Sequence, residues 1–100
     1  MKKVFIQYKI KPEQVSKVET LIRKVFDDLR TTRPDNISYS AQKSEDGQTF
    51  MHTYVAHEEV KNPVIGLQSF KELQEFIKLN HVEKPVSITL SDIDNYNALS

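Results

Sequence analysis

The stretch ISYSAQKSEDGQTFMHTYVA, residues 37–56, decides the fold, because two alternating runs of apolar and polar residues flank one turn signal. Alternation with a period of two is typical of a β-strand that buries one face. The turn signal is Asp46-Gly47, which favours a two-residue type I′ turn with positive φ at both central positions. The stretch therefore predicts a β-hairpin with this pair at its tip.

The turn also predicts which side chains share a face of the sheet. Counting back from it places Tyr39 opposite Tyr54, and side chains alternate between faces along each strand. The apolar face then carries Ile37, Tyr39, Ala41, Phe50, His52, Tyr54 and Ala56. The opposite face carries Ser38, Ser40, Gln42, Met51, Thr53, Val55 and His57.

Two helical patterns and two more strands surround the hairpin. Residues 4–10 alternate, and a shorter alternating run, residues 86–90, follows Pro85. Apolar residues recur at spacings of three and four over 15–29 and again over 70–77, which indicates amphipathic helices. The order β-α-β-β-α-β over residues 1–100 predicts one α+β, ferredoxin-like domain, with two helices on one face of a four-stranded antiparallel sheet.

Two finer features of this scheme follow from local signals. Ser69-Phe70-Lys71-Glu72 resembles a capping box and predicts the start of the second helix. The apolar residues of the last strand are expected beneath the helices, on the same face as the apolar residues of the first strand. The residues placed there from the last strand are Val86, Ile88 and Leu90.

Composition excludes several classes of function. The chain has 14 basic and 14 acidic residues, so it lacks the positive excess that nucleic-acid binding requires. It contains no cysteine, hence no disulfide and no thiolate metal site. No apolar run is long enough for a membrane helix, and the basic start lacks the apolar core of a signal peptide. A soluble cytoplasmic protein without a bound metal is expected.

The chain resembles the dimeric α/β-barrel superfamily, in its antibiotic-biosynthesis-monooxygenase-like branch. The resemblance covers nearly the whole chain and lies in elements that follow one another in order: Asp46-Gly47, Phe50-Met51-His52, Asn62-Pro63, Phe70, Gln74, Pro85 and Tyr96. It implies a homodimer whose two sheets close into a barrel, with a pocket between sheet and helices in each subunit. The mixed composition of the second face, where Phe5, Met51 and Val55 accompany Ser, Thr and Gln, also favours a covered sheet.

Relatives of this kind include cofactor-free monooxygenases of aromatic polyketides, haem-degrading enzymes, and small isomerases or dehydratases. The haem-degrading type relies on an Asn in the first strand, a Trp in the third strand and a His on the second helix. This chain has no Trp, and its first strand offers Gln7 and Tyr8 in place of Asn. His81 falls beyond the predicted stripe of the second helix. Haem is therefore not expected, nor is any other cofactor.

The candidate site centres on His52, as a neutral general base in a pocket. Tyr39 and Tyr54 are the candidate catalytic partners, and Tyr8 and Phe50 are candidate substrate-binding residues. A competing interpretation remains open, in which His52 is a hydrogen-bonded core histidine among core aromatics. His57 is expected to be solvated at the end of its strand. A metal site formed with Glu58 and Glu59 is not expected, because adjacent residues on a strand point to opposite faces and converge poorly.

The corresponding functional hypotheses come from different classes. The first is a cofactor-independent, monooxygenase-like enzyme that acts on a small aromatic or enolisable molecule. The second is a non-catalytic ligand-binding or accessory dimer of the same fold, and the third is a purely structural dimer. The expected partners are a second copy of the chain and a small aromatic ligand, with neither nucleic acid nor membrane.

Overall fold

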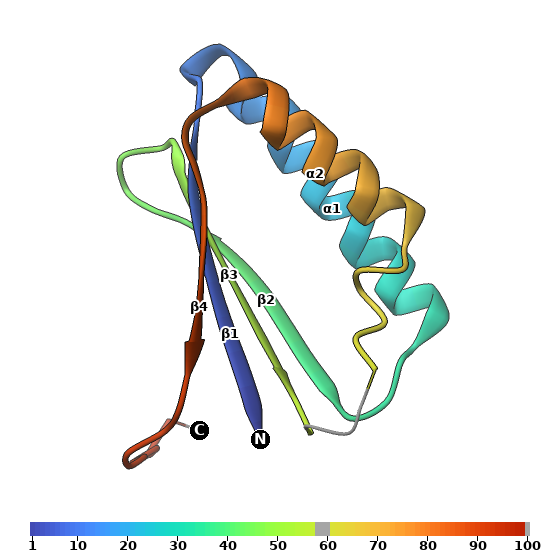
Figure 1. The fold of residues 1–100 in the computed structure, drawn as a ribbon, viewed down its shortest axis with the longest axis vertical. Coiled ribbons are helices and arrows are strands. Elements are labelled where there is room, and N and C mark those ends of the chain that lie inside the picture. The colour runs from blue at the N-terminus through green and yellow to red at the C-terminus, as the bar shows by residue number, and fades with distance from the viewer. Residues whose placement is uncertain (58–60, 100) are drawn as a thin grey trace.

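A computed structural model describes residues 1–57 and 61–99 of the chain. In chain order its elements are β1 (Lys2–Ile10), the 3-10 turn η1 (Pro12–Gln14), α1 (Val15–Thr32), β2 (Ile37–Lys43), β3 (Thr49–Ala56), α2 (Gln68–Asn80) and β4 (His81–Leu90). The strands form one antiparallel sheet in the order β2-β3-β1-β4. Both helices lie on the same face of this sheet and contact each other (Figure 1). The predicted α+β, ferredoxin-like architecture is confirmed.

The hairpin has the predicted register but a different turn. Tyr39 pairs with Tyr54, and the neighbouring pairs follow the same alternation. Within the Asp46-Gly47 pair only Gly47 has positive φ, at 74°, so the type I′ prediction is wrong. The Gly47 amide donates to the Ser44 carbonyl, and Asp46 Oδ1 accepts from the backbone amides of Gln48 and Thr49. The carboxylate of Asp46 thus shapes a longer loop that preserves the pairing of the strands.

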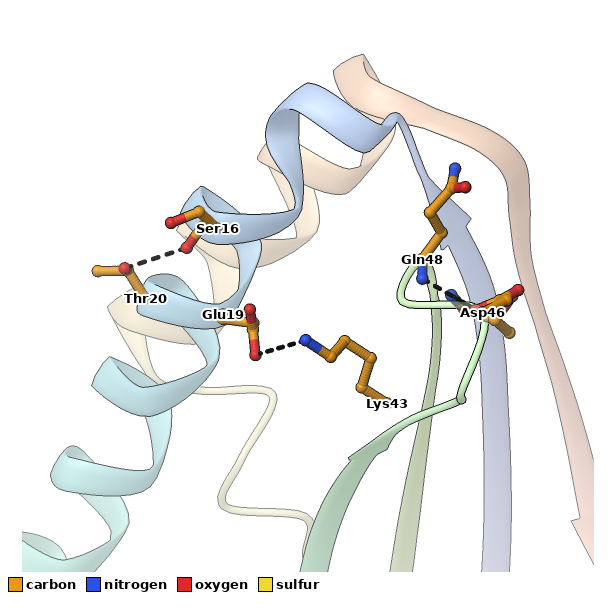
Figure 2. Close-up of polar contacts among 7 residues, drawn as sticks. Ser16, Glu19, Thr20, Lys43, Asp46 and Gln48 are labelled. Atoms are coloured by element: carbon orange, nitrogen blue, oxygen red, sulfur yellow. Dashed lines mark hydrogen bonds and ion pairs between the residues drawn. The ribbon is translucent and has the colours of Figure 1, made fainter.

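Figure 2 shows this loop beside the helix that covers the adjoining strand. Asp46 bonds the backbone of Gln48, while Lys43 on β2 forms a 3.3 Å ion pair with Glu19 on α1. Three groups lower the pKa of Asp46 to about 2: the Thr49 hydroxyl and the amides of Gln48 and Thr49. The turn is therefore built around a charged carboxylate.

The second helix does not begin with a capping box. It starts at Gln68, and the residue before it, Leu67, makes no side-chain cap. Ser69 is buried, and its hydroxyl has no hydrogen-bond partner within the described ranges. The capping prediction is wrong because the Leu67 carbonyl starts the helix by accepting from the Lys71 amide, which places Ser69 inside the first turn.

The last strand differs from the prediction in length and in facing. It starts at His81, directly after α2, and carries Pro85 in its interior. Its register on β1 pairs Ile6 with Ser87 and Phe5 with Ile88, so Ser87 shares the helix-covered face and Ile88 shares the open face. The predicted inward placement of Val86, Ile88 and Leu90 is therefore wrong.

Two register shifts in the β1–β4 pairing accompany this reversal. They lie between Gln7 and Lys9 and between Lys9 and Ile10, where β4 advances by one more residue than β1 at each step. Each extra residue is a β-bulge, which interrupts the simple alternation of faces along a strand. Alternation alone also never says which of the two faces is the covered one.

The core lies between the sheet and the helices. Its most completely buried side chains are Ile10, Val18, Val25, Phe50, Val64 and Leu73. They come from both helices, from the two central strands and from the segment before α2, so a single core joins the whole domain. Within residues 1–57 and 61–99, no helix is long and apolar enough to cross a membrane.

Candidate functional site

A hydrogen-bonded chain of three side chains lies between the central strands and the helices. His52 on β3 is only 3% exposed. Its Nε2 lies 2.7 Å from the hydroxyl of Tyr8 on β1, and its Nδ1 lies 2.7 Å from the hydroxyl of Tyr39 on β2. The antiparallel registers produce this arrangement, because β3 lies between β1 and β2 and all three side chains point to the helix-covered face.

All three groups are uncharged at neutral pH. Burial lowers the pKa of His52 to about 4 and raises the pKa of both Tyr8 and Tyr39 above the usual value. A neutral imidazole has one N–H donor and one acceptor nitrogen. One tyrosine therefore donates to His52, and the other accepts from it and keeps its own O–H free for another partner.

The three hydrogen-bonded side chains form part of the wall of a cavity of about 580 Å³ between α2, β1 and β4. The lining residues are Ile6, Tyr8, Tyr39, His52, Phe70, Leu73, Gln74, Ile77, Lys78, His81, Lys84, Pro85 and Ser87. The volume lies within the range of small-molecule sites, which are mostly apolar with a few placed polar groups. Tyr8, Tyr39 and His52 supply such groups at the sheet side of the cavity.

Two of the predicted site residues lie elsewhere in the core. Tyr54 is 5% exposed and does not line the cavity, and its hydroxyl has no hydrogen-bond partner among the described residues. Phe50 stacks on Tyr8, with ring centroids 5.7 Å apart, and lines a second hollow of about 400 Å³ between α1 and β2. The structure thus brings Tyr8 and Tyr39 to His52, whereas Tyr54 and Phe50 do not line the cavity.

His81 is a cavity residue that the sequence interpretation set aside. It is the first residue of β4, and its Nδ1 lies 3.0 Å from the carbonyl of Ile77. A carbonyl only accepts, so Nδ1 carries a proton in this contact. His81 comes to the cavity because the chain turns from α2 directly into β4 at this residue, and no local sequence pattern indicates that junction.

The alternative of a metal site at His57, Glu58 and Glu59 falls partly outside the described residues. His57 is exposed at the end of β3, as expected, while Glu58 and Glu59 lie outside the described residues. Within the described ranges, no group of three His, Asp or Glu side chains is placed to hold a metal ion.

Comparison with solved structures identifies the fold. The chain is similar to an antibiotic biosynthesis monooxygenase, at 17% identity and a TM-score of 0.74, with 94% of this chain and 100% of that one covered. It is also similar to Rv0793 from Mycobacterium tuberculosis, at 14% identity and a TM-score of 0.75, covering 96% and 98%. A Nitrosomonas europaea protein provisionally assigned to the same monooxygenase class gives 8% identity and 0.76, covering 94% and 100%.

These likenesses establish the architecture over almost the full chain. No protein-family model matches the sequence, and no curated protein matches it either. The chain therefore has the fold of antibiotic biosynthesis monooxygenase-like proteins, as the sequence resemblance implied. Because the identities are so low, the chemistry has to be argued from this chain's own residues.

Proposed function

We propose that this chain is a cofactor-independent, monooxygenase-like enzyme that binds a small aromatic or enolisable molecule in the 580 Å³ cavity. One observation carries the proposal: an uncharged Tyr8–His52–Tyr39 chain, with both hydrogen bonds at 2.7 Å, forms part of the cavity wall. The proposal gives the tyrosine role to Tyr8 and Tyr39, because Tyr54 does not line this cavity.

His52 works through its tyrosines in this mechanism, since both of its ring nitrogens are already engaged. A substrate O–H or acidic C–H gives its proton to the oxygen of the donating tyrosine, whose own proton moves to His52. The proton on the other ring nitrogen passes to the second tyrosine, which gives its hydroxyl proton to water. With Tyr8 as the donating tyrosine, the second is Tyr39, which also lines the hollow between α1 and β2. Each bond forms as its neighbour breaks, so the substrate becomes an anion and His52 ends as the opposite neutral tautomer.

The shifted pKa values suit a group of residues that passes a proton on. With a pKa of about 4, His52 is an imidazolium in roughly one molecule in a thousand at pH 7. Raised pKa values likewise disfavour the phenolates of Tyr8 and Tyr39. Charge therefore accumulates on the substrate. The anion can then add O₂ at a carbon that still carries a hydrogen, which forms a C–OOH group after protonation. Loss of water breaks the O–O and C–H bonds and leaves a C=O group, so the substrate itself supplies all four electrons and both hydrogens of the water.

The proposed active form is a homodimer in which two open sheet faces cover each other. The open face holds exposed apolar residues on β4, with Val86 at 52%, Ile88 at 47% and Leu90 at 40% exposure. Phe5 on β1 and Met51 on β3 share this face and are half-buried. A contiguous apolar surface on a sheet favours association with another protein surface.

Oxygen uptake tests the enzymatic proposal. A panel of hydroxynaphthalenes and cyclic 1,3-diketones is screened with an oxygen electrode, and products are identified by mass spectrometry with ¹⁸O₂. For a compound that is oxidised, Tyr8→Phe and Tyr39→Phe should each lower kcat at least a hundredfold, because each interrupts the proton path. Tyr96→Phe is the matched control, since Tyr96 is 92% exposed in the C-terminal segment. Unchanged turnover in both variants would contradict the proton path.

The same experiment distinguishes the alternative function, a non-catalytic protein that binds a small ligand. It is favoured by the burial of His52 and by the engagement of both its ring nitrogens, which is how a structural core histidine is satisfied. It predicts that a compound from the panel binds the cavity and shifts the melting temperature, while oxygen uptake never exceeds the uncatalysed rate.

A further inference from the structure

Two lysines from different elements line the cavity. Lys78 lies in the last turn of α2, and Lys84 lies on β4. His81 stands between them in sequence at the junction of the two elements. The thirteen lining residues include no Asp or Glu. The cavity therefore presents positive charge without an internal counter-ion.

The glutamates next to these lysines in sequence form no ion pair with them in the described part of the chain, although Glu83 and Lys84 both border the smaller hollow on the open face. Glu75 precedes Lys78 by one helical turn and Glu83 precedes Lys84, yet neither glutamate lines the cavity. The ion pairs found across residues 1–57 and 61–99 involve Lys3, Lys24, Arg30 and Lys43, and none includes Lys78 or Lys84. Both ammonium groups are thus available to a ligand.

A structural role explains only one of the two lysines. A cation in the last turn of a helix interacts favourably with the helix dipole, which accounts for Lys78. Lys84 sits among the β4 bulges, where no helix end needs a cation, and it borders both this cavity and a smaller hollow on the open face. Two lysines in the wall of a cavity without Asp or Glu are typical of a site that orients a ligand by its charged group.

We propose that the ligand of this cavity is an acid: an apolar ring whose carboxylate is held by Lys78 and Lys84, with the ring directed inward to His52. This deepens the proposed function by naming the substrate class, and it rests on that function only for the location of the site. Phe70, Leu73 and Ile77 on α2 supply the apolar wall that faces the ring. Gln74, one turn before Lys78, adds an uncharged donor at the same wall.

Binding of an acid and its neutral ester measures the contribution of the charge. Isothermal titration calorimetry at low ionic strength compares 3-hydroxy-2-naphthoate with its methyl ester, which keeps the ring and the phenol. The wild-type protein should bind the acid at least tenfold more tightly, and this preference should shrink as salt screens the charges. Binding of neither compound, or equal binding of both, would overturn the proposal.

Matched variants locate the charge recognition. Lys78→Gln and Lys84→Gln should each weaken binding of the acid about three- to tenfold, and the double variant should bind acid and ester alike. Affinity for the ester should stay constant throughout. Lys71→Gln is the control, because Lys71 lies on the same helix but does not line the cavity. An acid preference that survives in the double variant would exclude these lysines.

The result also separates this proposal from the enzymatic one. A preference for the acid without any oxygen uptake would leave the acidic ligand established and remove the monooxygenase function. Oxidation of neutral compounds only, with no preference for the acid, would do the reverse.

Discussion

Each face of the sheet carries groups that are more usual on the other. The covered face of β1, β2 and β3 holds, within its apolar core, a histidine and the hydroxyls of three tyrosines, whereas the open face of β1 and β4 exposes Val86, Ile88 and Leu90. A polar group inside a core is stable only when it is paired, and an apolar surface in water is stable only when it is covered. His52, Tyr8 and Tyr39 find their partners within the chain, while the hydroxyl of Tyr54 has none among the described residues and the apolar residues of the open face would be covered only in the proposed dimer.

The largest effect is expected from a charge on the open face. Ile88→Glu should weaken self-association about a thousandfold, because a symmetric dimer carries the substitution twice and each buried charge costs on the order of 2 kcal/mol. Ile93→Glu is the control, since Ile93 is fully exposed in the C-terminal segment. Light scattering coupled to size exclusion measures the mass. A wild-type monomer at micromolar concentration, or a dimer in the Ile88→Glu variant, would contradict association through the open face of the sheet.

Acid should lower the free energy of unfolding of the protein through His52 on the helix-covered face of the sheet. Its pKa of about 4 in the folded chain lies below the ordinary histidine pKa of 6.5, so the unfolded chain binds more protons between these two pH values. Stability from this group is therefore complete above pH 6.5 and is lost as the pH falls through 4, by about 3 kcal/mol in all. Urea unfolding at fixed protein concentration, from pH 7 to pH 4.5, measures the loss.

The His52→Gln variant isolates that contribution, because an amide keeps a donor and an acceptor but does not titrate in this range. The difference in unfolding free energy between wild type and variant should shrink steadily as the pH falls toward 4.5. The rest of the chain is identical in the two proteins, so its pH dependence cancels in the difference. A constant difference would mean that His52 is accessible to protons in the folded chain.

The smallest effects come from single hydroxyl groups on the inner face, and they should be unequal. Tyr39→Phe leaves His52 Nδ1 without its partner and should cost about 1–3 kcal/mol of unfolding free energy. Tyr54→Phe removes a buried hydroxyl that has no partner in the described part of the chain, so stability should stay within about 0.5 kcal/mol or rise. Equal losses in the two variants would show that Tyr54 is hydrogen-bonded after all.

The sequence predicted the hairpin well because two independent signals agreed there. Alternation over 37–43 and 49–56 defined the strands, and Asp46-Gly47 fixed their relative position, even though the turn itself has another geometry. The facing of the last strand could not be predicted in the same way. Its bulges around Pro85 break the alternation, and its apolar face is the one turned away from the helices.

The candidate site was predictable in part for related reasons. His52 and Tyr39 lie on one hairpin, so their common face followed from its register. The bond from Tyr8 depends on how β1 pairs with β3, a contact between segments 44 residues apart that no local pattern specifies. His81, Lys78 and Lys84 line the cavity only because α2 ends directly at β4, and the sequence suggested a loop and Pro85 between them.

The bulged β4 strand is also an edge of the sheet. An edge strand with regular free amides and carbonyls invites another strand to pair with it, which is a route to fibres. Pro85 offers no amide at mid-strand, and the irregular spacing on either side of it disrupts a continuous ladder. Growth by adding strands is therefore disfavoured at this rim, which leaves the open face as the surface for the proposed association of two copies.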